Sequence, residues 1–474
     1  MMSAVSSLFA VAFAWLIGAL LTGLLWPRRG EAALVLSVGA GVGLGVTSLI
    51  FFFASLVSAN PFPVAFAAEL LLSCSLLFLW LRKRRTLPPA LVAPAQPARS
   101  WLGALVRWTF VAACALALFS TVAAWRVEPY GSWDGWALWN MKARFLYRGG
   151  SAGYSQMVQP PLTWTHPDYP LLVPASVARS WAYTGSDSPF ATGLVATVFG
   201  VATLGLLVAG VHRLRNRLIA LTGGLVLLGT PFFVRFSSNE HADIPVGFFM
   251  LAATVLLGIA RDEGDRGVLF LAGLATGLAA WTKNEGLLFC VVLGLVFSTT
   301  QLVTKRWRNL PPLLGGLALA LLPVLWFKFA LAPPNDIMAG QHADGLAKLA
   351  DWSRHQIILK AWWRDLPKFG EWYSLPFLVM LLHLLGPVRG WFDRRTVVTG
   401  AILLLMLAGY YTVYLLSPYD LAWHLDSSLV RLLMQVWPVA VFLWCLLAVR
   451  AGPAAAQTSP AESPAGSPPS GQSA

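Results

Sequence analysis

The chain has 474 residues, of which 57% are hydrophobic and only 12% are charged, and its formal net charge is +13 at pH 7. Soluble domains carry about 25% charged residues, so this composition excludes a soluble globular enzyme. We expect an all-α polytopic membrane protein. The four cysteines lie in apolar runs, and their spacing is not typical of a disulfide framework or a zinc site.

Thirteen apolar runs are each long enough to cross a hydrocarbon core of about 30 Å as a helix. No Lys or Arg precedes the first run and no small-residue cleavage site follows it, so we interpret it as a retained helix. In chain order the runs lie near residues 4–26, 32–56, 62–81, 101–125, 189–210, 218–235, 243–260, 267–282, 285–303, 310–332, 373–390, 397–416 and 433–450.

Basic residues collect in alternate connections, and this bias assigns the two faces of the membrane. With the N-terminus outside, one set of connections carries 20 of the 34 Lys and Arg residues and six acids, a net charge of +14. The other set carries 14 residues of each sign. We expect the first set to be cytoplasmic. Because topology accounts for the basic composition, it does not indicate a nucleic-acid partner.

Two outer segments, residues 126–188 and 333–372, are long enough to be structured. In the first segment we expect an interfacial helix with one aromatic side, because tryptophan is favoured at the membrane surface. The residues with i, i+3, i+4 and i+7 spacing are Trp133, Trp136, Ala137 and Asn140, with Trp139 and Leu146 beside them.

The same topology places a set of charged and histidine side chains at the outer face. Mixed positive and negative side chains at one face are what a site for charged chemistry requires. The residues are Asp134, Lys142, Arg144, His166, Asp168, Glu240, His241, Asp243, Lys283, Glu285 and Arg431.

Four motifs along the chain resemble those of the GT-C glycosyltransferases. They are the run D-x4-W-x2-K-A-R from Asp134, "HPDYPLL" at 166–172, "ADIPVGFF" at 242–249 and "GLATGLAAWTKNEG" at 273–286. The order looks like the branch that includes protein O-mannosyltransferases and the aminoarabinose transferase of lipid A. The resemblance covers roughly residues 101–310, with a weaker echo in "SSLVRLLMQVWP" at 427–438.

This resemblance implies a catalytic aspartate in the first large outer loop and a sugar donor linked to a polyprenyl phosphate. The aspartate maps to Asp134, although Gly135 follows it where many relatives have a second acid. It also implies a multi-pass protein of the cytoplasmic membrane that acts at the periplasmic or extracellular face. The acceptor would be a glycan, a lipid or a protein.

We divide the chain on this basis into four parts. N-terminal transmembrane helices occupy residues 1–100, and a GT-C-like catalytic core with the outer loop 126–188 occupies residues 101–310. C-terminal helices with the outer loop 333–372 occupy residues 311–450. Residues 451–474, rich in Pro, Ser, Ala and Gly, form a disordered cytoplasmic tail.

Sugar transfer from a lipid phosphate requires a base for the acceptor hydroxyl and a stabiliser for the departing phosphate. Asp134 is the candidate base, and N-capping of a helix is the alternative. Asp243 is the candidate second catalytic carboxylate, and it too could cap a helix. The candidate phosphate ligands, which could instead snorkel toward the interface or bind lipid headgroups, are Lys283, Arg431, Lys142 and Arg144.

The remaining polar residues are candidates for binding the substrate or acceptor: His166, Asp168, Glu240, His241 and Glu285. No cofactor is implied with certainty. A divalent metal at the histidines and Asp168 is an open alternative, but the spacing is not that of a ligand set, and turn formation explains "HPDYP" as well. Glu69 lies inside a predicted span, where an acid is either functional or protonated and hydrogen-bonded.

Two other classes of protein fit the same sequence. A transporter or lipid-carrier flippase also has many spans and buried polar groups, but it usually places them near the bilayer midplane. An inactive GT-C-like subunit that binds lipid or protein would also retain the fold. Charges gathered at one face favour the transferase.

The topology predicts that a cysteine introduced at Ser151 reacts with a membrane-impermeant thiol reagent in intact cells, because residues 126–188 face outward. Cysteine-accessibility labelling measures this directly. Labelling that occurs only after lysis would show that the chain has the opposite orientation in the membrane.

Overall fold

The computed structural model describes residues 2–28, 30–86, 101–260, 265–335, 345–372 and 393–448, and the elements in these residues are helices. Within them, nine helices are long and apolar enough to cross a membrane. This confirms the predicted all-α polytopic fold. The nine are α1 (Met2–Leu25), α2 (Ala32–Val57), α3 (Pro61–Arg84), α4 (Trp101–Val127), α8 (Pro189–Leu214), α13 (Asn284–Val303), α14 (Leu310–Trp326, continued by a π-helical turn at Phe327–Leu331), α19 (Arg394–Leu415) and α20 (Leu421–Leu447).

Three shorter apolar helices correspond to further predicted runs: α9 (Arg217–Leu228), α11 (Asp243–Ile259) and α12 (Arg266–Thr282). The run predicted at 218–235 is broken, because Pro231 starts a separate helix, α10 (Pro231–Phe236). The run at 373–390 and the tail at 451–474 lie outside the described residues.

The last transmembrane helix begins earlier in the structure than the sequence analysis predicted. We expected a span at 433–450, but α20 already begins at Leu421, where the Asp420 carboxylate accepts a hydrogen bond from the Trp423 amide at 2.8 Å. The polar residues of its first turns lowered the apparent hydrophobicity, and they include both the exposed Asp426 and the partly buried Arg431. Arg431 is therefore inside a helix.

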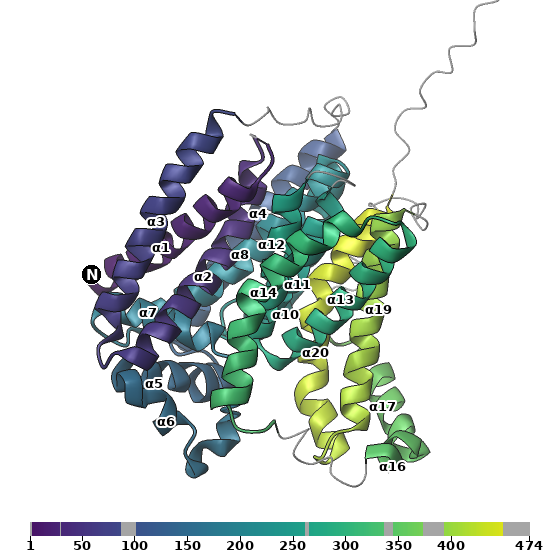
Figure 1. Cartoon of the computed structure of the whole chain (residues 1–474). Coiled ribbons are helices and arrows are strands. Elements are labelled where there is room, and N and C mark those ends of the chain that lie inside the picture. The colour runs from purple at the N-terminus through teal and green to yellow at the C-terminus, as the bar shows by residue number, and fades with distance from the viewer. Residues whose placement is uncertain are drawn as a thin grey trace, which may run out of the picture.

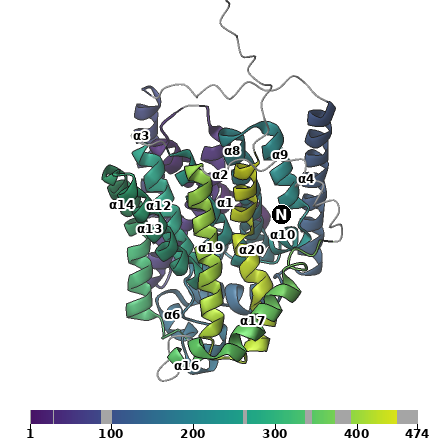
Figure 2. The ribbon, with the colours of Figure 1, turned by 90° about the vertical axis from the view of Figure 1, so that its right-hand side faces the viewer.

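Both long outer segments are structured, as predicted. The first contains α5 (Met141–Gly149), α6 (Gly153–Met157) and α7 (Leu172–Thr184), and the described part of the second contains α16 (Gly345–Ala350) and α17 (Trp352–Asp365). Helices α5, α6, α16 and α17 gather at one end of the bundle, which we name the α5–α17 end (Figures 1 and 2). Two segments far apart in the sequence thus share one end.

The prediction that one side of a helix around Trp133 is aromatic is wrong. Residues Gly135–Asn140 form a π-helical turn, whose i→i+5 bonding changes the angular spacing of the side chains. Trp133 and Trp136 are 60% and 46% exposed, whereas Trp139 and Asn140 are buried. The tryptophans therefore divide between the surface and the interior.

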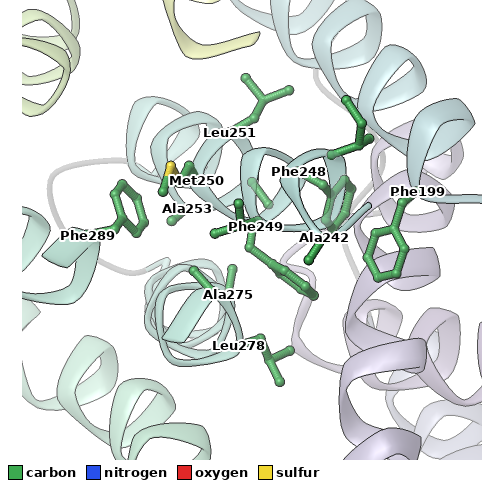
Figure 3. Packing of buried hydrophobic residues seen from close by; sticks show 14 of the residues in the cluster. Phe199, Ala242, Phe248, Phe249, Met250, Leu251, Ala253, Ala275, Leu278 and Phe289 are labelled. Atoms are coloured by element: carbon green, nitrogen blue, oxygen red, sulfur yellow. The ribbon is translucent and has the colours of Figure 1, made fainter. Parts of the chain in front are cut away.

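Helix α11 is the centre of the core. It is apolar on all sides, and such a helix must be surrounded by other elements. Phe248 and Phe249 both lie 5.8 Å, between ring centroids, from Phe199 of α8, and Ala275 and Leu278 of α12 lie on another side of α11 (Figure 3). The start of α11 is thereby fixed in the interior, where its first residue is an aspartate.

A second buried contact ties α7 to the N-terminal helices. Arg179 donates to both carboxylate oxygens of Glu69 at 2.6 and 2.7 Å, and to the carbonyl oxygen of Ala10 at 2.8 Å. The Tyr183 hydroxyl donates to the same carboxylate at 2.6 Å. Both charged side chains are at most 1% exposed. Glu69 therefore has a full set of partners that join α1, α3 and α7.

Replacing Arg179 with Ala should destabilise the protein by about 3–5 kcal/mol, because it leaves the Glu69 carboxylate buried and unpaired. The midpoint of thermal unfolding in detergent measures the loss. Arg148→Ala, which breaks an exposed ion pair with Asp187, is the matched control and should change the midpoint little. Equal effects of the two substitutions would contradict a structural role for the Glu69 pair.

Candidate active site

Asp243, the first residue of α11, is the centre of a polar cluster at the α5–α17 end. Its side chain is fully buried. One carboxylate oxygen accepts hydrogen bonds from Lys283 Nζ at 2.9 Å and from Gln435 Nε2 at 2.6 Å. The other accepts from Arg431 at 3.2 and 3.3 Å, and His241 Nδ1 lies 3.5 Å away. This set of partners satisfies the buried charge, as it must.

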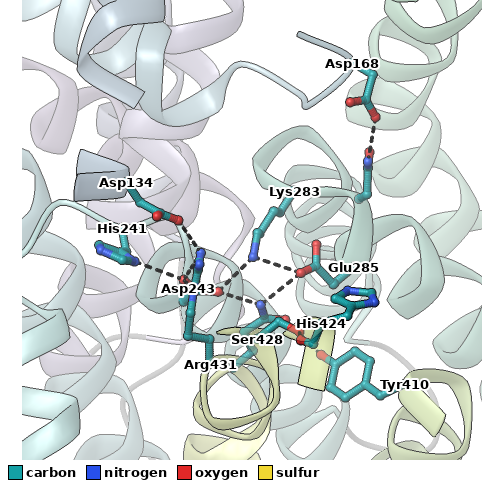
Figure 4. Close-up of polar contacts among 12 residues, drawn as sticks. Asp134, Asp168, His241, Asp243, Lys283, Glu285, Tyr410, His424, Ser428 and Arg431 are labelled. Atoms are coloured by element: carbon teal, nitrogen blue, oxygen red, sulfur yellow. Dashed lines mark hydrogen bonds and ion pairs between the residues drawn. The ribbon is translucent and has the colours of Figure 1, made fainter. Parts of the chain in front are cut away.

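Arg431 joins Asp243 to the first outer segment. Its Nη2 atom lies 2.7 Å from Oδ2 of Asp134 and 3.2 Å from Oδ2 of Asp243 (Figure 4). The Asp134 side chain is 15% exposed and that of Arg431 is 24% exposed. The contact brings together residues almost 300 positions apart in the chain, and both side chains are partly exposed.

Lys283 extends the cluster toward α13. It lies between the end of α12 at Thr282 and the start of α13, and its Nζ atom lies 2.8 Å from Oε1 of Glu285 in the first turn of α13. Gln435 of α20 donates to both Asp243 and Glu285 and accepts from the Tyr410 hydroxyl at 2.9 Å. Helices α11, α12, α13, α19 and α20 are thus linked by one polar network.

A neighbouring cluster surrounds Asp168, whose side chain is 4% exposed. One of its oxygens accepts from Asn284 Nδ2 at 2.9 Å and from Asn335 Nδ2 at 2.8 Å, and Lys328 Nζ lies 3.3 Å away. Asn284 stands between Lys283 and Glu285 in the sequence, so the two clusters adjoin. The "HPDYP" segment therefore contributes its aspartate to the site and is more than a turn.

The capping alternatives for the two candidate catalytic aspartates have no support in the geometry. Asp134 precedes the π-helical turn in helical conformation, and its carboxylate makes no capping hydrogen bond. Asp243 is inside the first turn of α11, where Ala242 occupies the capping position. The contacts of both carboxylates are with cationic side chains.

Two candidate phosphate ligands lie apart from this cluster. Lys142 is fully buried and donates to the carbonyl oxygen of His166 at 2.7 Å, and its Nζ atom lies 5.3 and 5.2 Å from the ring centroids of Trp139 and Tyr169. Burial lowers its pKa to about 7, although the charge of Asp168 opposes the shift. Arg144 is paired with Asp187 at 3.2 Å.

Glu240 and His241, which are adjacent in the connection before α11, contact different groups. Glu240 has a positive φ of 63° and accepts hydrogen bonds from Thr192 at 2.6 Å and from Asn140. Burial raises the pKa of its carboxyl to about 7. His241 Nε2 instead lies 2.5 Å from the Ser132 hydroxyl, beside Asp134 in the chain. Only His241 reaches the Asp243 cluster.

The structure thus joins seven of the predicted site residues in adjoining clusters, with Arg431 as the bridge: Asp134, Asp168, His241, Asp243, Lys283, Glu285 and Arg431. His166 stacks on Tyr169 at 5.0 Å, and Glu240, Lys142 and Arg144 lie to the side. The sequence analysis missed Gln435, Lys328, Asn284 and Asn335. Gln435 and Lys328 were detectable, since each is a lone polar residue in an apolar run.

Within the described ranges, no group of three or more His, Cys, Asp or Glu side chains is arranged to hold a metal ion.

The raised pKa of Glu240 predicts a pH-dependent stability. Between its ordinary pKa of 4.5 and about 7, only the unfolded chain ionises, so stability falls as the pH rises through this window. Glu240→Gln should remove the loss, and the gain at pH 8 should approach about 3 kcal/mol. Thermal unfolding from pH 4 to 9 measures the profile. Glu128→Gln, at an exposed site, should keep the parental profile; a parental profile for Glu240→Gln would show that Glu240 is not responsible.

A comparison with protein-family models gives a match over residues 168–327 to the family described as dolichyl-phosphate-mannose-protein mannosyltransferase. The matched region is less than half of the chain, and it includes Asp168, Asp243 and Lys283 but neither Asp134 nor Arg431. No curated protein and no solved structure matches. The family match supports a GT-C-like membrane glycosyltransferase.

Proposed function

We propose that the protein transfers a sugar from a polyprenyl-phosphate donor to an acceptor at the outer face of the cytoplasmic membrane, with inversion at the anomeric carbon and with Asp134 as the general base. The observation that carries this proposal is the Arg431 bridge. It holds an accessible carboxylate, Asp134, within one cluster with the cations Arg431 and Lys283. Direct displacement requires the general base and the phosphate site to lie within reach of the same sugar ring.

Lys283 and Arg431 are the proposed ligands of the donor phosphate. An ammonium group has three N–H donors and a guanidinium group has five. Lys283 uses two for Asp243 and Glu285, and Arg431 directs its Nε and Nη2 atoms at carboxylates, which among the described residues leaves the donors of its Nη1 atom for a ligand. The carboxylates hold the cations in place, so the remaining donors are preorganised for charge that develops on the leaving phosphate.

The proposed roles of Asp243 and Asp134 differ because their surroundings differ. Asp243 is enclosed by donors and has no access to a substrate hydroxyl, so it positions Lys283 and Arg431. Within the part of the chain that the structure describes, Asp134 has one ion-pair partner, and its side chain is 15% exposed. It accepts the proton of the acceptor hydroxyl as that oxygen bonds to the anomeric carbon, while the bond between this carbon and the phosphate oxygen breaks and the electron pair leaves with the phosphate.

The acceptor is proposed to approach from the α5–α17 end, next to Asp134. The Ser132 hydroxyl and His241 lie beside the base, and Asp168 and Glu285 lie on the other side of Lys283. These four are the proposed acceptor or sugar contacts. Four other candidates have no proposed role in substrate binding, because their contacts are with groups outside the cluster: Lys142, Arg144, His166 and Glu240.

Replacing Asp134 with Asn should reduce transfer by about 10²–10⁴-fold, the range for loss of a general base, since the side chain keeps its size but loses its basicity. Initial rates with a polyprenyl-phosphate sugar and the folded protein measure this. Asp187→Asn, which removes another ion-paired outer aspartate, should keep near-parental rates. Parental activity of a folded Asp134→Asn protein would show that another residue is the general base.

Replacing Lys283 with Met should weaken donor use by about 10–100-fold, the value of a charge-assisted hydrogen bond, and should also destabilise the fold because Asp243 loses a partner. Adding Asp243→Asn should recover much of the thermal stability without recovering donor use. If the double variant regains both, then Lys283 acts only as a structural counter-ion.

A further inference from the structure

A largely apolar groove of about 860 Å³ lies on the side of the bundle that α4 borders. Most of its lining comes from α8, and the rest comes mainly from α2, α4 and α9. Figure 2 shows α4 at the edge of the bundle, beside α9, and within α4 only Val106 and Thr121 are buried. Leu36 and Val201 line the groove and are exposed, so a membrane lipid can reach it.

The groove follows α8 away from the candidate active site. Thr192, in the first turn of α8, donates to Glu240 at 2.6 Å. The lining residues of α8 run from Thr197 to His212 in its last turn, a length of roughly 22 Å along the helix. This exceeds the roughly 15 Å that one leaflet contributes to the hydrocarbon core. The end of the groove at His212 is roughly 30 Å along α8 from Thr192, so it is a separate place in the molecule.

This end of the groove holds a cation that the described part of the chain leaves uncompensated. Two neighbouring arginines have acidic partners: Arg213 lies 2.7 Å from Glu31, and Arg215 lies 3.6 Å from Asp393. Arg217, the first residue of α9, lines the groove, is exposed and has no ion-pair or hydrogen-bond partner among the described residues. It also stands at the positive end of the α9 dipole, where a cation is not favoured. An external anion would supply the charge that Arg217 lacks.

His212 adds an unpartnered polar atom at the same end. Its Nδ1 atom is buried without a hydrogen-bond partner among the described residues, and its side chain lines the groove as Arg217 does. An imidazole N–H and a guanidinium can both donate to phosphate oxygens. None of the described residues that line the groove is acidic. The polar end therefore has the chemistry of a phosphate site.

The remaining lining fits a hydrocarbon chain. An apolar groove left empty in a membrane loses the dispersion contacts that a chain would make. We propose that the groove binds one acyl chain of an anionic phospholipid, whose phosphate contacts Arg217 and His212. A lipid with net negative charge is favoured because a zwitterionic headgroup brings a cation of its own to an end that already has one. The positive-inside prediction places this lipid in the cytoplasmic leaflet, and the proposal does not depend on the transfer reaction.

The test compares two phospholipids with the same chains and different net charge. Full-length protein in neutral detergent is titrated with dioleoyl phosphatidylglycerol or dioleoyl phosphatidylcholine, and native mass spectrometry measures the lipid that each sample retains. The parental protein should retain phosphatidylglycerol about tenfold better, the effect of one charge-assisted hydrogen bond. Equal retention of the two lipids would show that the groove holds any acyl chain and would overturn the anionic assignment.

The variant Arg217→Gln should lose the preference for phosphatidylglycerol and keep the retention of phosphatidylcholine. Arg82→Gln, which removes an exposed arginine at the end of α3, is the matched control and should keep the preference. Ala209→Phe fills the groove, leaves every charge in place and should reduce the retention of both lipids, so the proposal stays testable if Arg217→Gln misfolds. The proposal is overturned if the two arginine variants weaken the preference equally, or if folded Ala209→Phe protein retains lipid as the parental protein does.

Discussion

The charge of Asp243 must be balanced inside the helical bundle, and this requirement organises the α5–α17 end of the molecule. A carboxylate at the start of a helix that is buried on every side is costly unless cations and hydrogen-bond donors surround it. The donors come from the residue that joins α12 to α13, from α20 and from the connection before α11. The packing of α11 and the geometry of the candidate active site therefore depend on the same contacts.

Arg431 transmits this constraint to the surface. Because it contacts the buried Asp243 and the accessible Asp134 together, the first outer segment is held against α20 by a charge inside the core. The π-helical turn after Asp134 assists, since it buries Trp139 and Asn140 while Trp133 and Trp136 stay exposed. Of the charges in this aromatic segment, which are unusual in so hydrophobic a chain, Asp134 thus has its partner in a membrane-spanning helix, whereas Lys142 and Arg144 contact His166 and Asp187 outside these helices.

Much of this fold could be predicted, because apolar runs of sufficient length have few alternatives to helices in a membrane. The errors have physical causes. Polar residues in the first three turns of α20 lowered the hydrophobicity of this segment, and Pro231 divided one predicted run. In the site, the sidedness of the charges predicted that Asp134, Asp243, Lys283 and Arg431 share one face. It could not predict which would touch, since the Arg431–Asp134 contact depends on helix packing between segments distant in sequence.

The central claim is that Lys283 and Arg431 receive the donor phosphate while the side chain at position 134 faces the anomeric carbon. A structure of the Asp134→Asn protein with an intact polyprenyl-phosphate sugar tests it most directly. The account predicts phosphate oxygens within hydrogen-bond distance of Lys283 Nζ and of the Arg431 guanidinium, with the substituted side chain at position 134 on the opposite face of the sugar from the phosphate. A phosphate bound away from both cations, or a sugar whose anomeric carbon faces away from position 134, would contradict it.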